Sequence, residues 1–285
     1  MMMHRRNFLA GVALAASALA APALAAPAPL RLTYVQAWPS SNLTTHIAAS
    51  IIRQKLHVPV TLTTTSAGPM WAAVASGRAD ALLTAWLPTT HATYWARYKD
   101  KLVDLGPITT GTWLGLAVPT YVPVDSLTQL DAEHAKFGNR IVGIEAGAGL
   151  MINTHKAISA YGMHDMHLLT SSTAAMQAQL ARAVAHKQWI VVTAWKPLGI
   201  WSRFPLKPLA DPKHVYGVSG HIDAIVNPAL EKRSPQVVAF LRQFKLPLDD
   251  IQAMMVQLDK GEPLAKVTAG WIDAHATEVA HWTQQ

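Results

Sequence analysis

The chain has 285 residues and a formal net charge of +7, from 24 Lys and Arg against 17 Asp and Glu. Its basic residues are scattered and are not interleaved with aromatic residues, so the charge pattern excludes a nucleic-acid-binding surface. The chain has no cysteine, which excludes disulfides, cysteine-based metal sites and a lipid-modified cysteine after a signal peptide.

The N-terminus has the pattern of a cleaved export signal. Arg5 and Arg6 give a positively charged start with a twin-arginine pattern, and an apolar, alanine-rich stretch follows over residues 9–21. This stretch is too short for a membrane-spanning helix, and Ala23-Leu24-Ala25 supplies a small-x-small cleavage site. We expect residues 1–25 to be removed, by either the general or the twin-arginine export route. The remaining chain is then expected to be a soluble periplasmic protein that is not a lipoprotein.

Strands and helices alternate in the first half of the remaining chain. Alternating apolar residues predict a strand over residues 30–35, and Leu43, Ile47 and Ile51 predict a helix with one buried face. A second strand over residues 58–62, a short helix over residues 69–76 and a strand that leads into Trp86 complete this half.

The second half repeats the same order. Strands are predicted over residues 140–144, 168–169 and 189–192, and helices over about residues 150–161 and 173–185. A glycine-rich turn over residues 145–149 joins the first strand to the first helix. Strand–helix order written twice predicts an α/β protein with two lobes, each a mostly parallel sheet flanked by helices, and a ligand cleft between the lobes.

The lobes can be given boundaries along the chain. Residues 26–118 are expected to form lobe I and residues 119–220 lobe II, with short links over residues 115–119 and about 221–226 that cross between the lobes. The rest of residues 221–285 is expected to form helices that pack on lobe I, because its apolar residues recur at helical spacing.

Three tryptophans are each followed within two residues by proline, in Trp38-Pro39, Trp86-Leu87-Pro88 and Trp195-Lys196-Pro197. Trp86 and Trp195 close nearly identical strand-like runs, which proline prevents from continuing. Ligands of open α/β sheets bind outside the carboxyl ends of the strands, so the three indoles are expected to meet in the cleft. Tryptophan is the best aromatic partner for a cation, and quaternary ammonium groups are the usual guests of such aromatic cages.

Short segments throughout the chain after the signal resemble the glycine betaine/proline betaine binding proteins of ABC importers. They follow one another in the order of that family and comprise residues 68–71, 85–91, 104–107, 118–122, 143–150, 209–213 and 265–267. The resemblance implies a two-lobed, type II-like periplasmic binding protein that closes on its ligand and is neither an enzyme nor dependent on a cofactor. It also implies a partner, the membrane permease of an ABC importer, which is driven by a separate ATPase.

The resemblance also implies roles for particular residues. Trp38, Trp86 and Trp195 match the three tryptophans that box the trimethylammonium head of the ligand. The ligand carboxylate is expected to be held by a histidine that matches His91 and by two backbone amides. These two amides match those of Gly143 and Ile144.

The chain departs from the family after the third tryptophan, where relatives carry a small residue, proline, histidine and an aromatic residue, and this chain has Lys196-Pro197-Leu198-Gly199. A lysine that entered a cation cage would repel the ligand unless its stem carried the charge to solvent. Glycine betaine is the first expectation for the ligand, and choline, carnitine, proline betaine or another zwitterion remain alternatives. An exported carbohydrate-active enzyme is a further alternative, but it requires two carboxylates at the cleft, where the sequence offers only Glu145.

Overall fold

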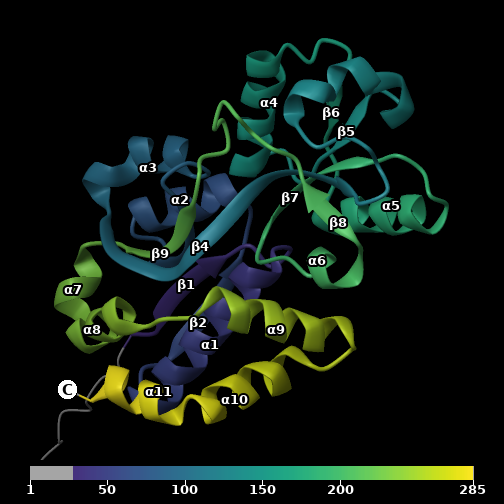
Figure 1. Cartoon of the computed structure of the whole chain (residues 1–285). Coiled ribbons are helices and arrows are strands. Elements are labelled where there is room, and N and C mark those ends of the chain that lie inside the picture. Colours follow the sequence, from purple (N-terminus) through teal and green to yellow (C-terminus); the bar gives the residue numbers. More distant parts are fainter. Residues whose placement is uncertain (1–27, 285) are drawn as a thin grey trace, which may run out of the picture.

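The computed structural model describes residues 28–284, which fold into two α/β lobes joined by long crossing strands (Figure 1). The predicted signal over residues 1–25 lies outside the described residues. Among those that are described, no helix is long and apolar enough to cross a membrane.

The sheet of lobe I is built on three parallel strands, β1 (Leu30–Tyr34), β2 (Val60–Thr64) and β3 (Ala81–Leu87), in the order β2-β1-β3. Helix α1 (Pro39–Lys55) connects β1 to β2, and α2 (Ala67–Ala75) connects β2 to β3. Proline suits the first turn of α1, where its missing N–H has no helical acceptor to lose. Every residue of β3 is buried, because neighbouring strands cover both of its edges and helices cover its faces.

Lobe II repeats this arrangement with β5 (Arg140–Val142), β6 (His167–Leu169) and β7 (Val191–Lys196), which are parallel in the order β7-β5-β6. Helices α4 (Gly149–Tyr161) and α5 (Thr173–Ala185) make the connections. The Ser172 hydroxyl caps α5 by accepting a hydrogen bond from the Ala175 N–H over 3.1 Å. Helix α5 has the bounds that the sequence predicts.

The outward link between the lobes is longer than the short crossing expected over residues 115–119, whereas the return link covers nearly the expected residues 221–226. The outward crossing is β4 (Val103–Pro119), a strand of 17 residues that pairs antiparallel with β9 in its first part and with β7 in its last. The return crossing is β9 (Gly220–Val226), which lies antiparallel between β3 and β4. The expected mostly parallel sheets are therefore mixed, and Figure 1 shows β4 passing from one lobe into the other.

The C-terminal segment is helical and contacts lobe I. It forms α7 (Ala229–Arg233), α8 (Pro235–Gln243), α9 (Leu248–Asp259), α10 (Leu264–Ala274) and α11 (Ala276–Thr283). Helices α9 and α10 pack on α1, and α8 and α9 on β4. Their apolar faces form one core with α1 and the strands of lobe I, including Phe240, Phe244 and Ile251.

The remaining elements are short. Lobe I also contains α3 (Ala92–Tyr98) and the 3₁₀ helix η1 (Lys99–Lys101). Lobe II also contains the 3₁₀ helices η2 (Leu127–Gln129) and η3 (Asp131–Phe137), helix α6 (Ile200–Arg203) and strand β8 (Leu206–Pro208), which pairs with β4. Helix α3 begins directly after the loop that follows β3, and this places it at the lip of the cleft.

Candidate functional site

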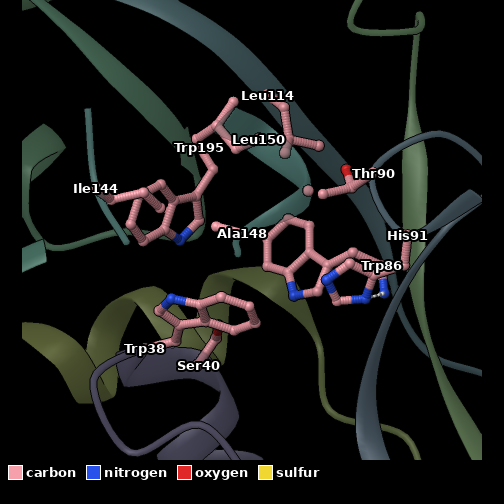
Figure 2. Close-up of a pocket in the computed structure, with 11 residues that line it drawn as sticks. Trp38, Ser40, Trp86, Thr90, His91, Leu114, Ile144, Ala148, Leu150 and Trp195 are labelled. Carbon is pink, nitrogen blue, oxygen red and sulfur yellow. Dashed lines mark hydrogen bonds between the residues drawn. The ribbon is translucent and has the colours of Figure 1, made fainter. Parts of the chain in front are cut away.

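A pocket lies between the lobes, and its walls come from both of them (Figure 2). From lobe I it is lined by Trp38, Ser40, Trp86, Thr90 and His91, from the crossing strand β4 by Leu114, and from lobe II by Ile144, Ala148, Gly149, Leu150 and Trp195. No acidic side chain is among these residues. Among residues 28–284, no group of three or more His, Asp or Glu side chains is arranged to hold a metal ion.

The three tryptophans singled out in the sequence line this pocket together (Figure 2). Trp38 is the residue before α1, Trp86 is the last residue but one of β3, and Trp195 is the last but one of β7. Each is buried, with 4–7% of its surface exposed. The indole N–H of Trp201 donates to the Trp195 carbonyl over 2.6 Å and so anchors the backbone that carries the third ring. The pocket thus presents three aromatic faces, two from lobe I and one from lobe II.

His91 also lines the pocket, and its surroundings fix both its orientation and its protonation. Its ring stacks on Trp38 with centroids 6.0 Å apart and meets the edge of Trp71 at 5.8 Å. The backbone N–H of Trp86 donates to Nδ1 of His91 over 3.1 Å, so in the neutral ring Nε2 carries the proton. Burial lowers the pKa of His91 to about 3 because the charged ring would lose its hydration. His91 is therefore a neutral hydrogen-bond donor at physiological pH.

The backbone amides of Gly143 and Ile144, expected to face a ligand carboxylate, are turned elsewhere. The Gly143 N–H donates to the Leu169 carbonyl over 2.9 Å, and Gly143 is not part of the pocket wall. The Ile144 N–H points at the Met151 sulfur, 3.2 Å away, so only its side chain contributes to the wall. The expectation is corrected on this point, because the pairing of β5 with β6 already occupies the first amide.

Two other residues with main-chain amides, Gly149 and Leu150, are part of the pocket wall and lie at the start of α4. A helix leaves its first N–H groups without helical acceptors, and within the described chain neither of these two N–H groups has a backbone acceptor. Gly149 lies so close to lobe I that a Cβ built on it would be 1.9 Å from the Thr90 carbonyl oxygen. Gly149 of lobe II therefore lies against the residue that precedes His91 in lobe I, and Gly149, Leu150 and His91 line the same pocket.

Several pocket residues were not identified from the sequence. Leu114 lies on β4, which was not predicted as a strand, and Ser40 and Leu150 lie in the first turns of helices whose ends were predicted only approximately. Trp71 is fully buried, and its edge contact with His91 makes it the support of a pocket residue. The sequence signal for this role was that Trp71 lies within residues 68–71, one of the segments that carry the family resemblance.

Lys196, the departure from the family pattern, points away from the pocket. It is exposed and is not part of the pocket wall, and its Nζ lies over the Trp201 ring, 5.0 Å from the ring centroid. Neighbouring residues of a strand face opposite sides, so a buried Trp195 directs Lys196 outward.

The comparisons with known proteins agree with this architecture. Residues 28–274 match the family described as the substrate-binding domain of ABC-type glycine betaine transport systems. A glycine betaine/carnitine transport binding protein, GbuC of Listeria monocytogenes, is 36% identical over 166 residues, which are 58% of this chain. The matched region is 54% of that relative, so the chain spans about half of the length of the curated protein.

Solved structures cover more of the chain. The lactococcal OpuAC protein in its closed form with glycine betaine has a TM-score of 0.84 and 32% identity, over 90% of this chain and 99% of that one. A glycine betaine/L-proline-binding protein (ProX) from Borrelia burgdorferi has a TM-score of 0.86 and 28% identity, over 90% and 97% of the two chains. These similarities confirm the two-lobed binding-protein fold. The chain belongs to the family of substrate-binding domains of ABC-type glycine betaine transport systems and not to an enzyme family.

Proposed function

We propose that this protein captures glycine betaine, or a closely related quaternary ammonium osmolyte, in the pocket between its lobes. In its closed form it would deliver the ligand to the membrane permease of an ABC importer, whose energy comes from a separate ATPase. The observation that carries the proposal is the meeting of Trp38, Trp86 and Trp195 around one pocket that no acidic side chain lines.

The three indoles suit the trimethylammonium head of such a ligand. A quaternary nitrogen has no N–H, so its recognition depends on apolar contact and on the negative faces of aromatic rings. Each ring contributes roughly 0.5–2 kcal/mol, with the larger value where water is excluded. A carboxylate in the cage would repel the carboxylate of glycine betaine, and the wall lacks one.

The carboxylate of the ligand finds donors beside the cage. Nε2 of His91 carries a proton that the hydrogen bond at Nδ1 leaves free, and the amides of Gly149 and Leu150 lie at the start of α4, a helix of 13 residues. The partial positive charge of a helix N-terminus favours an anion there. We assign the carboxylate to these three donors, in place of the amides of Gly143 and Ile144.

The proposed donors in the pocket wall also distinguish between the alternative ligands. Choline shares the trimethylammonium head but has a hydroxyl in place of the carboxylate, so it would leave the donors of α4 and His91 without an anion. Proline betaine and carnitine keep both charges and differ in shape and length. The donors proposed for the carboxylate therefore favour a zwitterion over choline.

Calorimetric titration of the mature protein with glycine betaine, proline betaine, carnitine and choline tests the proposal. Trp38→Ala, Trp86→Ala and Trp195→Ala are each expected to weaken glycine betaine binding by about 1–3 kcal/mol. Trp189→Ala is the control, because this ring packs on Phe137 away from the pocket. Unchanged affinity in all three cage variants would refute the proposed site.

The proposal also covers the processing, the cellular location and the lobe boundaries of the protein. We propose that residues 1–25 are a cleaved export signal and that the mature protein acts in the periplasm without a lipid anchor, since it has no cysteine to modify. We also propose residues 26–118 and 119–220 as lobes I and II, with residues 221–285 returning to lobe I. Mass spectrometry of the protein from the periplasmic fraction tests the cleavage site and the absence of a lipid.

A further inference from the structure

A hydrogen bond between Tyr94 and Gly147 joins the two lobes outside the pocket, as do the hydrogen bonds between Leu198 of lobe II and Gln252 of α9, which packs on lobe I. The Tyr94 hydroxyl, on α3 of lobe I, donates to the Gly147 carbonyl, in the loop before α4 of lobe II, over 2.7 Å. Neither residue is part of the pocket wall. The bond therefore exists only when the lobes are together, yet it requires no atom of a ligand.

The Tyr94 ring is held in place on lobe I by its neighbours. It stacks on Trp71 with centroids 6.2 Å apart and an angle of 16°, and it meets His91 nearly at right angles with centroids 5.7 Å apart. Gly68 lies against the ring, and a Cβ there would be in ordinary contact with it at 3.7 Å. Partial burial raises the pKa of Tyr94, so its hydroxyl remains a donor at neutral pH. Little side-chain freedom is left to lose when the hydroxyl meets its acceptor.

The acceptor stands next to the donors assigned to the ligand. Gly147 precedes Gly149 by two residues, in the loop whose position determines where the first amides of α4 lie. A bond that fixes the Gly147 carbonyl against lobe I therefore holds the loop and closes the lip of the cleft at the same time.

We propose that Tyr94 is a positioning residue that latches the closed lobes through Gly147 and so slows ligand release. The inference rests on the proposed function, because it takes the interlobe pocket as the binding site. The latch forms after the ligand has entered, so it acts on the dissociation rate and leaves the association rate nearly unchanged. It also touches no ligand atom, so it strengthens the binding of every ligand around which the lobes close by the same factor.

Tyr94→Phe tests the latch, because it removes one oxygen and keeps the stacked ring. Stopped-flow tryptophan fluorescence is expected to show a rise in the dissociation rate of about 3- to 10-fold, the effect of one lost hydrogen bond. The factor is expected to be equal for glycine betaine and proline betaine, with the association rate unchanged. Tyr98→Phe is the matched control, because Tyr98 lies on the same helix and its hydroxyl has no hydrogen-bond partner within the described chain.

The outcomes separate the latch from the binding site. Dissociation from Tyr94→Phe at the parental rate, with binding still lost in Trp195→Ala, would overturn the latch and leave the pocket in place. A change in dissociation that differs between the two ligands would also overturn it, since Tyr94 would then act on the ligand itself. Parental binding in both Tyr94→Phe and Trp195→Ala would refute the proposed site as well. A lower melting temperature with unchanged dissociation would assign Tyr94 a purely structural role.

Discussion

The backbone N–H of Trp86 donates to Nδ1 of His91, which lies five residues further along the chain. One residue of the cage therefore fixes the tautomer of the histidine beside it, because a ring nitrogen that accepts a hydrogen bond carries no proton. In the proposed site, the end of β3 and the loop that follows it thus supply an aromatic ring for the cation and a donor for the anion.

His91→Ala is expected to weaken glycine betaine binding by about 1.5–3 kcal/mol, the range for a hydrogen bond to a charged group. Choline has no carboxylate that His91 could bind, so the affinity for choline is expected to fall less in this variant. Parallel calorimetric titrations of the parent and the variant with both ligands measure the difference. Equal losses for the two ligands would remove His91 from the carboxylate site.

The lowered pKa of His91 predicts a pH dependence of stability. Between about pH 6.5 and pH 3 the unfolded chain protonates this histidine and the folded protein does not. The unfolded state then binds more protons, so the free energy of unfolding falls as the pH falls through this window. Denaturant unfolding of the parent and of His91→Gln measures the effect. The stability of the parent relative to the variant is expected to fall by about 1 kcal/mol between pH 6 and pH 5; no change would contradict the neutral, buried ring.

Gly149 and Gly147 offer a matched pair of substitutions in one loop. A Cβ at Gly149 would lie 1.9 Å from the Thr90 carbonyl oxygen, whereas a Cβ at Gly147 would meet nothing within 4 Å. Gly149→Ala is therefore expected to prevent the lobes from closing and to weaken ligand binding by about 3 kcal/mol or more, as overpacking against backbone does. Gly147→Ala is expected to bind like the parent. Small-angle scattering with and without glycine betaine checks whether closure is lost in the first variant alone.

That the three tryptophans line one pocket could be predicted, because each is followed by a proline at the end of a strand or the start of a helix. The runs before Trp86 and Trp195 are nearly identical, and the proline after each marks the end of the strand. His91 could be predicted only through the family resemblance, since nothing in its own neighbourhood distinguishes it from a surface residue at a helix start.

The amides could not be assigned from the sequence alone. The chain contains two candidate pairs in one loop, Gly143-Ile144 and Gly149-Leu150, and each is a glycine followed by an aliphatic residue. The pairing of β5 with β6 favours the second pair, because it gives the Gly143 N–H an acceptor in Leu169. That pairing joins residues far apart in the chain, which local pattern does not reveal.

The crossing strand β4 was missed for a related reason. It contains Gly106, Pro107 and Gly111, which locally predict turns. In the structure its register with β9 shifts at these places, and both glycines have positive φ, 93° and 77°. Glycine tolerates this conformation, so the strand bends at bulges and continues where a sequence pattern predicts that it ends.

Lys196→Ala tests whether the side chain of Lys196, which departs from the family pattern, points away from the pocket. Lys196 is exposed, and its Nζ lies over the Trp201 ring. Truncating the side chain is therefore expected to change glycine betaine affinity by less than about 0.5 kcal/mol, as for an ordinary surface substitution. The lost cation–π contact is expected to lower the stability of the fold by about 0.5–1 kcal/mol. Trp201→Ala is the contrasting variant, because it removes the hydrogen bond to the Trp195 carbonyl and is expected to weaken ligand binding. Should Lys196→Ala clearly weaken glycine betaine binding, the lysine would have to reach into the cleft as an anchor for the carboxylate, and the donors at α4 would have to be reassigned.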